Sequence, residues 1–436
     1  MDSEQNTSSV FLSWGMGVES TAILTRWLAD PSSRNFPLSA LTVLVAQTGN
    51  EWQSTKALCE TYILPLLARH RIRLVQVARA GHLEEDGIEV LDDTDQPDQL
   101  HTDGAYKLSD ELLFAGTVPQ FAGVHTCALK FKAFVLEQWL SQENDGKSYS
   151  HAFGYNKDET KRIEKSEYAI AKRIIAFGFN SMEGKRIERA NEYDSINRES
   201  FYPLMEWNWT REDCLQYLKQ QFNVAWIKSA CVACPFVKLN EHSISRFQQS
   251  PEEAAQALLL EYTSLCLNHR STLYKNRSLM SVLRKAGNHQ AIEAFNQLRA
   301  RTPMATYRVR RIMTSKGHGH RCTEQIPHRT LDQLIKEKKL TPLSFHHDDY
   351  NIATGYAVER EEDTFPTREE FYVLAPTTVG SRARYGIPWF EDKWIELNQQ
   401  ALFPAPTKPR SRRRTSTTTR PSPNYPNRAT LSSVAR

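Results

Sequence analysis

Short apolar segments alternate with helical patterns from Ser9 to Val77, and this alternation limits the possible folds more than any other feature of the chain. Glycine-containing turns separate the first two apolar segments from the helical patterns that follow them. We expect strands at Ser9–Trp14, Leu41–Ala46 and Arg73–Val77, and helices at Glu19–Ala29 and Glu51–His70 with a kink at Pro65. Strands that alternate with helices form a parallel sheet covered on both faces. The sequence therefore predicts an α/β fold with a doubly wound parallel sheet.

The pattern is less regular beyond Val77. The segment Glu84–Glu111 contains eleven acidic residues and a single lysine, and we expect a mobile excursion there. Further helices are expected at 127–140, after the N-cap residue Thr210, at 251–269 and at 278–299, with a strand at 150–153. Residues 302–400 have mixed character and predict no particular element.

A length of 436 residues allows two or three domains. We divide the chain into a sheet-forming region at 1–245, a helical region at 246–300, a mixed C-terminal region at 301–403 and a tail at 404–436. From Lys408 onward the tail has eight basic residues and no acidic one, while the rest of the chain has 47 basic and 51 acidic residues. Its Pro, Ser, Thr and Arg content predicts disorder. Such a tail either contacts nucleic acid through phosphates or only keeps the protein soluble.

Composition excludes several classes of protein. Seven cysteines in so long a chain do not form a disulfide framework, so thiols in a reducing compartment are expected. The apolar runs are much shorter than a membrane span, and residues 1–9 lack the build of a signal peptide. We therefore expect a cytoplasmic protein without a membrane partner. The sequence leaves the oligomeric state open.

The turn between the first strand and helix has the features of an anion-binding loop. It reads Ser13-Trp-Gly-Met-Gly-Val-Glu-Ser-Thr21. Glycines allow the backbone to approach an anion, and free N–H groups at a helix N-terminus bind phosphate. The loop lacks the Gly-Lys-Ser/Thr of a Walker motif, and Ser20 stands where the dinucleotide motif has its third glycine. An ordinary glycine turn between strand and helix is the alternative interpretation.

Six segments together resemble the phosphoadenosine phosphosulfate (PAPS) reductase-like family of the PP-loop superfamily, the adenine nucleotide alpha hydrolase-like enzymes. Each is similar to a family motif, and they occur in the family's order over residues 8–240. They are the loop Gly15–Ser20, Gln47-Thr-Gly-Asn-Glu51, His125-Thr-Cys-Ala-Leu-Lys130, Gly154–Arg162, Tyr202–Trp207 and Cys231-Val-Ala-Cys-Pro235. The resemblance implies a five-stranded PP-loop (Rossmann-like) sheet that binds ATP or a PAPS-type adenine nucleotide with Mg²⁺.

The resemblance also implies roles for individual residues. Glu19 is expected either to help hold Mg²⁺ or only to favour the helix N-terminus. Lys130 and Arg162 are candidate clamps for phosphate or sulfate, and Glu51 and Glu159 are candidates for ribose, metal or acid–base contacts. The expected nucleotide-binding residues are Ser13, Gly15, Gly17, Ser20, Thr21, Thr48 and Gly49.

Two cysteines form a C-x-x-C turn at Cys231 and Cys234, a spacing that directs two sulfurs toward one centre. By resemblance Cys127 is the third ligand, and three cysteines suit a [4Fe–4S] cluster with one open iron. Zinc is the alternative metal. A redox dithiol and simple buried cysteines are alternative interpretations of the pair.

The family's E-C-G-x-H segment, whose cysteine attacks sulfate, has no match here; Cys322 in Gly317-His-Gly-His-Arg-Cys322 is the nearest candidate. We therefore expect an enzyme that uses ATP, with release of pyrophosphate, to activate an acceptor for sulfur or group transfer. The acceptor could be a nucleic acid. The alternatives are a thiol-dependent reductase of PAPS or adenylyl sulfate, and a regulatory protein that binds a nucleotide without turnover. Two metal-like groups, at His318–Cys322 and His346–Asp349, are interpreted as unligated.

Overall fold

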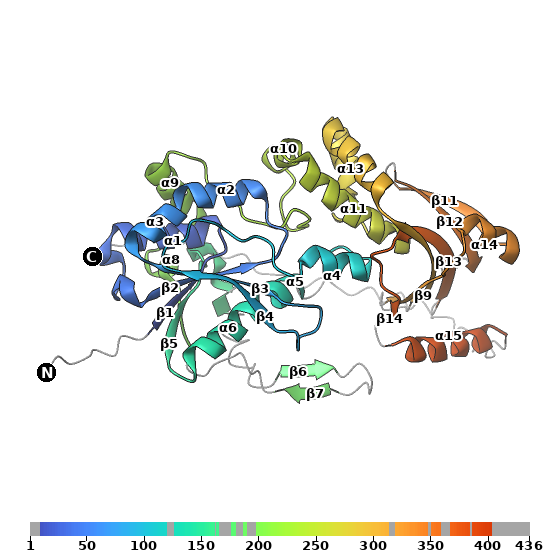
Figure 1. Cartoon of the computed structure of the whole chain (residues 1–436), viewed down its shortest axis with the longest axis horizontal. Helices are drawn as coiled ribbons and strands as arrows, with labels where there is room; N and C mark the ends of the chain where they lie inside the picture. The colour runs from blue at the N-terminus through green and yellow to red at the C-terminus, as the bar shows by residue number, and fades with distance from the viewer. Residues whose placement is uncertain are drawn as a thin grey trace, which may run out of the picture.

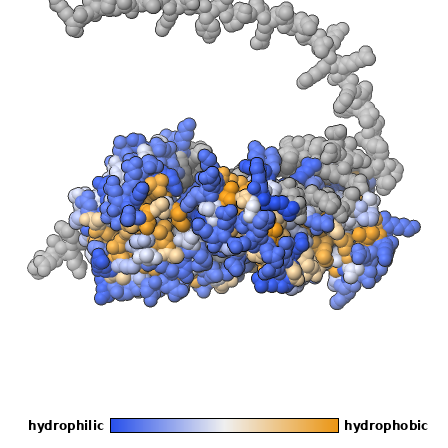
Figure 2. Space-filling model, turned by 90° about the horizontal axis from the view of Figure 1, so that it is seen from above, coloured by the Kyte–Doolittle hydropathy of each residue, from blue (hydrophilic) through white to orange (hydrophobic). Residues whose placement is uncertain are grey.

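Two β-sheets lie at opposite ends of the molecule, with helices between them (Figure 1). The computed structural model describes residues 9–119, 126–161, 163–164, 176–179, 186–189, 198–313, 319–347, 350–358, 367–383 and 386–402. The predicted tail at 404–436 lies outside the described residues. Hydrophilic residues cover most of the face seen in Figure 2, with smaller apolar patches between them.

The first sheet has six strands in the order β4-β3-β2-β1-β5-β8. Its strands are β1 (Ser9–Ser13), β2 (Leu41–Gln47), β3 (Arg73–Arg79), β4 (Ile88–Thr94), β5 (Tyr149–Ala152) and β8 (Arg198–Phe201). The five strands from β3 to β8 pair in parallel, whereas β4 pairs with β3 in the antiparallel direction. The α/β prediction is confirmed, and the sheet has one strand more than the five expected.

Helices cover both faces of this sheet. They are α1 (Val18–Ala29), α2 (Gln53–Tyr62), α3 (Leu64–His70), α6 (Phe134–Asn144), α8 (Pro203–Glu206) and α9 (Arg211–Phe222). On one face Val10 and Leu12 pack with residues of α1, α3 and α9, and on the other Phe11 packs with α6. Successive side chains of β1 therefore pack against helices on opposite faces of the sheet, because side chains alternate between the two faces of a strand. Thr210 caps α9 as predicted, because its side chain accepts the N–H of Asp213.

The acidic segment Glu84–Glu111 is not the excursion that its composition indicates. It contains the edge strand β4 and the start of helix α4 (Leu108–Ala115). Arg73 pairs with Asp93 across the β3–β4 ladder at 2.8 Å. An edge strand tolerates many charges because one of its faces remains open to solvent. The acidic composition of this segment therefore gives no indication of the edge strand β4.

Four helices follow the first sheet: α10 (Glu241–Gln249), α11 (Pro251–Leu267), α12 (Leu279–Lys285) and α13 (His289–Arg301). The prediction of one helix at 278–299 is wrong, because the helical conformation is interrupted between α12 and α13. Gly287 has φ +67° at the break, and the side chain of Asn288 caps α13 through the N–H of Ala291. A left-handed glycine after a helix is a common termination signal.

The C-terminal region forms a second, antiparallel sheet in the order β11-β12-β13-β9-β10-β14. Its strands are β9 (Met304–Met313), β10 (Gly319–Gln325), β11 (Thr341–His347), β12 (Tyr350–Val358), β13 (Thr367–Pro376) and β14 (Arg382–Ala383). Helices α14 (Leu331–Lys338) and α15 (Ile387–Leu402) accompany it. A separate two-stranded ladder pairs β6 (Ala176–Phe179) with β7 (Arg186–Arg189).

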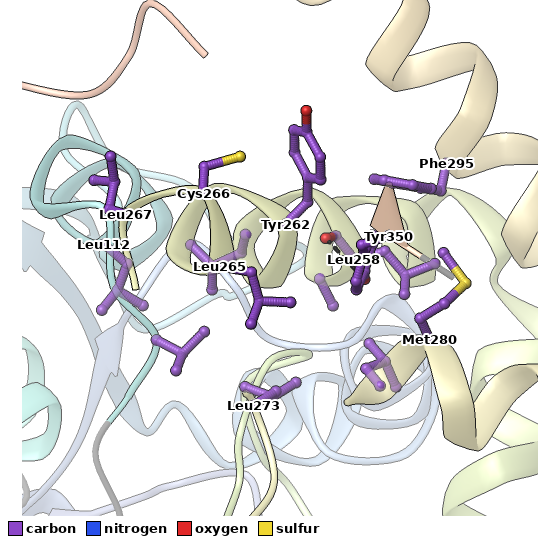
Figure 3. Close-up of a cluster of buried hydrophobic side chains, with 14 of the residues drawn as sticks. Leu112, Leu258, Tyr262, Leu265, Cys266, Leu267, Leu273, Met280, Phe295 and Tyr350 are labelled. Carbon is purple, nitrogen blue, oxygen red and sulfur yellow. Dashed lines mark hydrogen bonds between the residues drawn. The ribbon is translucent and has the colours of Figure 1, made fainter. Parts of the chain in front are cut away.

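Helix α11 lies between the two ends of the molecule and carries the largest core cluster (Figure 3). Figure 3 shows Leu258, Tyr262 and Leu265 on this helix, with Tyr350 of the second sheet beside them. The same cluster includes Trp52 and Leu112 from the first half of the chain. Within the part of the chain that is described, no helix is long and apolar enough to cross a membrane.

Candidate nucleotide and cysteine site

The loop from Ser13 to Thr21 leaves the carboxyl end of β1 and enters α1. The hydroxyl groups of Ser20 and Thr21 accept hydrogen bonds from within the loop itself. The Gly15 N–H donates to Oγ of Ser20 at 3.2 Å, and the indole Nε1 of Trp14 donates to Oγ1 of Thr21 at 2.9 Å. Thr21 is fully buried and Ser20 nearly so. These two residues, predicted to bind phosphate, therefore hold the loop in shape.

The backbone of this loop is left-handed at Met16, with φ +58°, whereas Gly17 has φ −84°. Beside this loop, the structure requires a small residue at Gly154, on the chain leaving β5. A Cβ at Gly154 would lie 2.9 Å from the backbone nitrogen of Ser20, closer than real Cβ contacts allow. The segment after β5 therefore packs tightly against the first turn of α1.

Glu19 lies in the first turn of α1 and forms an ion pair with Arg211. Its Oε1 also accepts a hydrogen bond from Nδ2 of Asn156 at 3.5 Å. A carboxylate at this position is favourable beside the N-terminal end of the helix dipole. The contacts explain Glu19 without a metal ion, and its predicted role with Mg²⁺ stays a prediction.

A cavity of about 390 Å³, called here the loop cavity, opens at the carboxyl edge of the first sheet. In doubly wound sheets this edge is where ligands bind. Four of the predicted residues line it, namely Ser13, Gly15, Thr48 and Glu51. Ligand-sized cavities in proteins begin at about 300 Å³, so the space suits a small molecule.

Two cationic side chains line the loop cavity, Lys132 and Arg198. Lys132 is half-buried. The Arg198 side chain is only 5% exposed and lies 3.7 Å from Glu137. Partly buried cations act strongly on an anion because little water screens them. Lys132 therefore makes the loop cavity attractive to phosphate groups, whereas Arg198 is already paired with Glu137, which lines the same cavity.

The predicted clamp Lys130 points elsewhere and pairs with Glu111 of α4. Lys130 and Lys132 both belong to the π-helical turn η3 (Leu129–Ala133), between α5 (Thr126–Ala128) and α6. A π-helical turn contains more residues than an α-helical turn, so side chains after it appear on a different face. Sequence spacing at the α-helical period could not indicate which lysine reaches the cavity.

Aromatic rings form one wall of the loop cavity. Phe153 and Tyr155 line it, with ring centroids 6.1 Å apart and planes only 13° apart. Tyr202 continues the stack at 5.8 Å from Tyr155. Flat aromatic surfaces beside cations suit a ligand that joins a planar base to phosphates.

Beneath the loop, Oγ of Ser13 and Nε2 of His151 lie 2.8 Å apart. His151 is 2% exposed. Burial, with a smaller contribution from the charge of Arg198, lowers the pKa of His151 to about 3. The imidazole is therefore neutral at physiological pH, and His151 supports the loop without adding charge.

Glu51 lines both the loop cavity and a second cavity beside it. Its carboxylate accepts hydrogen bonds from Ser229 Oγ at 2.8 Å and from the Ala230 N–H at 3.0 Å. Burial raises the pKa of Glu51, although Lys132 and these hydrogen bonds oppose the shift. A carboxyl group with a raised pKa between two cavities is a candidate for proton transfer.

The second cavity, called here the cysteine cavity, has a volume of about 480 Å³. All three predicted cysteines, Cys127, Cys231 and Cys234, line it. Burial raises the pKa of Cys231 to about 12 and also raises the pKa of Cys234. Both thiols are therefore protonated at neutral pH unless a metal displaces the protons. The structure brings Cys127 to the pair Cys231 and Cys234, which lies about 100 residues later in the sequence.

The donor chemistry of the three cysteines suits a soft metal or a cluster. Among the described residues, however, no group of three or more His, Cys, Asp or Glu side chains is placed to hold a metal ion. All three cysteines are free thiols. A metal centre here would require these side chains to move together.

The segment after β2 joins the two cavities. Oγ1 of Thr48 lies 3.3 Å from Sγ of Cys231, and the Asn50 carbonyl accepts the N–H of Val232 at 2.8 Å. Gly49 has φ +76°, and a Cβ there would lie 2.6 Å from Cγ of Lys107. Gly49 therefore supports a tight turn at the wall of the cysteine cavity.

Two of the other candidates, Glu159 and Cys322, do not line either cavity. Glu159 closes a capping box with Asn156, and Arg162 falls outside the described residues. Cys322 is completely buried on β10, and its Sγ lies 3.8 Å from a guanidinium nitrogen of Arg310. His318, Asp348 and Asp349 also fall outside the described residues.

Sequence reasoning missed Lys132, Arg198 and Tyr155. Only Tyr155 lay within a recognised motif, and the other two carry no local signal. In the comparisons with known proteins, no family model, no curated protein and no solved structure matches this chain.

Proposed function

We propose that this chain is a PP-loop enzyme of the PAPS reductase-like type that binds ATP or a related adenine nucleotide in the loop cavity. An acceptor oxygen would attack the α-phosphorus of ATP, pyrophosphate would leave, and a second nucleophile would then displace AMP. The product is an acceptor carrying sulfur or another transferred group. The six motifs of the sequence motivate this family assignment.

The observation that carries the proposal is the charge and position of the loop cavity. Lys132 and Arg198 face a cavity at the carboxyl edge of five parallel strands, beside the start of α1. Fixed cations stabilise the charge that develops on a leaving pyrophosphate. Mg²⁺ would add to this effect. Glu51 stands where a proton could be moved between the nucleotide and a group in the cysteine cavity.

The chemistry of Cys127, Cys231 and Cys234 supports a proposed [4Fe–4S] or zinc centre. A cluster would supply sulfur chemistry and zinc a structural centre; no reaction step above depends on either. The test is anaerobic purification followed by measurement of iron, zinc, acid-labile sulfide and the visible spectrum. Iron and sulfide that disappear in the C231S/C234S double variant would support the cluster. A metal-free protein would contradict a metal centre.

Nucleotide use is tested by calorimetric titration with ATP and with PAPS, together with an assay for pyrophosphate release. We expect micromolar binding of one nucleotide, and release of pyrophosphate once an acceptor is supplied. An extract of cellular RNA and DNA is the first acceptor to try, followed by thiol labelling of the nucleic acid. Failure of both nucleotides to bind would contradict the proposal.

The turn formed by Cys231 and Cys234 also favours a second candidate, a thiol-dependent reductase of PAPS or adenylyl sulfate. The Cys234 N–H donates to the Cys231 carbonyl at 3.0 Å, which places both residues in one turn. In contrast, Cys322 is fully buried and unsuited to attack a nucleotide. Sulfite release that requires thioredoxin and is lost in C231S would favour this candidate.

The ion pair between Glu19 and Arg211 favours a third candidate, a regulatory protein that binds a nucleotide without turnover. In this arrangement the acidic residue of the loop is already neutralised. Tight binding of ATP without pyrophosphate release under any acceptor condition would favour it.

A further inference from the structure

Two segments that follow the first sheet contain basic residues but no acidic residue. Residues 214–240 have three lysines, and residues 262–292 have five arginines and lysines. The chain before the tail has more acidic than basic residues, so these two segments differ from the rest of it. A local excess of one charge attracts a partner of the opposite charge.

The structure brings the second segment to the turn formed by Cys231 and Cys234, called here the cysteine turn. Leu273 and Tyr274 belong to the core cluster against which Cys231 packs. Burial, followed by the charges of Glu261 and Cys234, raises the pKa of Tyr274. The charge of Cys234 acts on Tyr274 because the two side chains are close to each other.

Exposed cations flank the cysteine turn on both segments. We call four of them the basic rim: Lys228, Lys238, Lys275 and Arg277. Lys228 precedes the two cysteines and Lys238 follows them, and the charge of Lys228 is felt at Cys234. Lys275 lies in a tight turn, in which the backbone N–H groups of Tyr274 and Arg277 each donate to the carbonyl of the other, at 3.2 and 3.1 Å.

The cations of the basic rim are not neutralised by carboxylates. None of the four side chains forms an ion pair within the part of the chain that the structure describes. In contrast, Lys107 in the wall of the cysteine cavity pairs with Asp103 at 2.8 Å, and Lys130 pairs with Glu111. The basic rim is therefore available to a polyanion.

The backbone on both sides of the cysteine turn is held by hydrogen bonds. The carbonyl of Lys228 accepts a guanidinium N–H of Arg246 at 3.0 Å. The carbonyl of Lys238 accepts the hydroxyl of Ser243 at 3.0 Å. The positions of the two lysines beside the cysteine turn are therefore fixed, which lowers the entropic cost of binding a partner.

The cysteine cavity lies beside the basic rim and has a volume of about 480 Å³. Leu112, Val232 and Leu260 contribute apolar surface to its wall. Its ionisable side chains other than cysteine are mainly carboxylates, so phosphates are favoured at the rim and disfavoured inside the cavity. Cations beside an apolar cavity suit a polymer that joins phosphates to uncharged planar bases better than they suit an acidic peptide.

We propose that the basic rim binds the phosphate backbone of a nucleic acid strand and holds the strand across the cysteine turn. Contacts between cations and phosphates carry no sequence information, so the rim positions the strand without selecting its sequence. That this strand is the acceptor rests on the proposed function; that it binds here does not.

Three polyanions test the proposal: a short single strand of RNA, a DNA strand of the same sequence, and polyglutamate of equal charge. Their affinities for the full chain are measured by fluorescence anisotropy over a range of salt concentrations. We expect both nucleic acids to bind, with an affinity that falls as the salt concentration rises, and polyglutamate to bind more weakly. Polyglutamate that binds as tightly as the nucleic acids would replace the strand by an acidic protein segment and reject this inference.

The double variant K275A/R277A locates the surface. Its matched control is K336A/K338A, which removes the same charge from exposed lysines of α14. K275A/R277A should weaken both nucleic acids about tenfold, and the control should leave them unchanged. The slope of log affinity against log salt should become shallower by about 1.4, at about 0.7 for each phosphate contact of a single strand. Equal affinities in wild type and K275A/R277A would overturn the proposal, because the basic tail is the same in both.

Acetylation of lysines, read by mass spectrometry, locates the strand on the wild-type protein. Bound RNA should slow the acetylation of Lys228, Lys238 and Lys275 and leave that of Lys336 unchanged. Equal protection of all four lysines, or protection of none, would contradict a specific surface. Thermal unfolding shows whether K275A/R277A and its control remain folded.

Titration of the same variants with ATP separates this inference from the proposed function. ATP binding should be the same in K275A/R277A as in wild type, because neither residue lines the loop cavity. Absence of ATP binding in every form, with binding of the strand through the basic rim intact, would reject the proposed function alone. ATP binding with release of pyrophosphate, and no effect of K275A/R277A on the strand, would reject this inference alone.

Discussion

The two sheets use their charged residues in opposite ways. At the edge of the first sheet, Lys132 and Arg198 face a cavity large enough for a ligand. In the second sheet, Arg311 pairs with Glu369 at 2.8 Å, and both side chains are buried. Arg310 on the same strand contacts Glu324 and Glu391. Lys132 faces a cavity that a ligand could enter, whereas the charges that pair within the second sheet serve its structure.

Because of this difference, we expect charge-removing substitutions in the two regions to have different effects. Removing a charge from the second sheet should lower stability, and removing one from the loop cavity should lower affinity.

The largest effect is expected for R311M. It leaves the carboxylate of Glu369 buried without its counter-ion, which costs about 3–5 kcal/mol. R308M is the control, because Arg308 is more exposed and its pair with Glu370 should contribute about 1 kcal/mol or less. Urea denaturation measures both. Similar losses for the two variants would show that burial does not distinguish the two ion pairs.

The buried carboxyl group of Glu261 on α11, which accepts several hydrogen bonds, should make the stability of the protein depend on pH. It accepts the N–H groups of Leu273 and Leu279 and the hydroxyl of Tyr350. Burial, opposed by these bonds, raises the pKa of Glu261 to about 7 from an ordinary value of 4.5. The folded protein therefore holds this proton more tightly than the unfolded chain does.

Stability from Glu261 should be fully present below pH 4.5 and be lost as the pH rises toward 7. The expected loss is about 3 kcal/mol at most, at 1.36 kcal/mol for each unit of pKa. Urea denaturation from pH 4.5 to 8 in wild type and E261Q isolates the effect. An equally steep pH dependence in E261Q would assign it to other groups.

K132A and K130A compare two lysines of one helical turn. Loss of a charged contact to phosphate costs about 1.5–3 kcal/mol, so K132A should weaken ATP about 10- to 100-fold. K130A should have a much smaller effect, since Lys130 pairs with Glu111 outside the loop cavity. Calorimetric titration gives both affinities. A larger loss in K130A would restore the role predicted from the sequence motif.

The smallest effect is expected for C322A in the second sheet. Cys322 packs with Ile312 and Phe390 as a small apolar residue. The variant should lose about 1 kcal/mol of stability. Metal content and nucleotide affinity should match the wild type. Loss of a catalytic activity in a folded C322A protein would assign chemistry to the second sheet.

The sequence predicted the first sheet better than the second because of where the charges lie. Strands such as β2 are apolar on both faces and stand out between polar turns. On β9, three arginines interrupt the apolar pattern, and the glutamates that pair with Arg311 and Arg308 lie about 60 residues away. Local periodicity does not reveal a charge that is neutralised by a distant strand.

The candidate site shows a similar limit. The motifs identified the loop and all three cysteines of the cysteine cavity. They did not identify Lys132, since the π-helical turn changes which side chains face the cavity.

The guanidinium group of Arg321, on the second sheet, donates to the carbonyls of Ala115 and Gly116 at the end of α4. Helix α4 forms part of the cysteine cavity, and 205 residues separate Gly116 from Arg321. At about 5–20 residues per second, a ribosome takes roughly 10–40 s to add that length of chain. The wall of the cavity thus gains part of its support late in translation, after the cysteines of the site have already been synthesised.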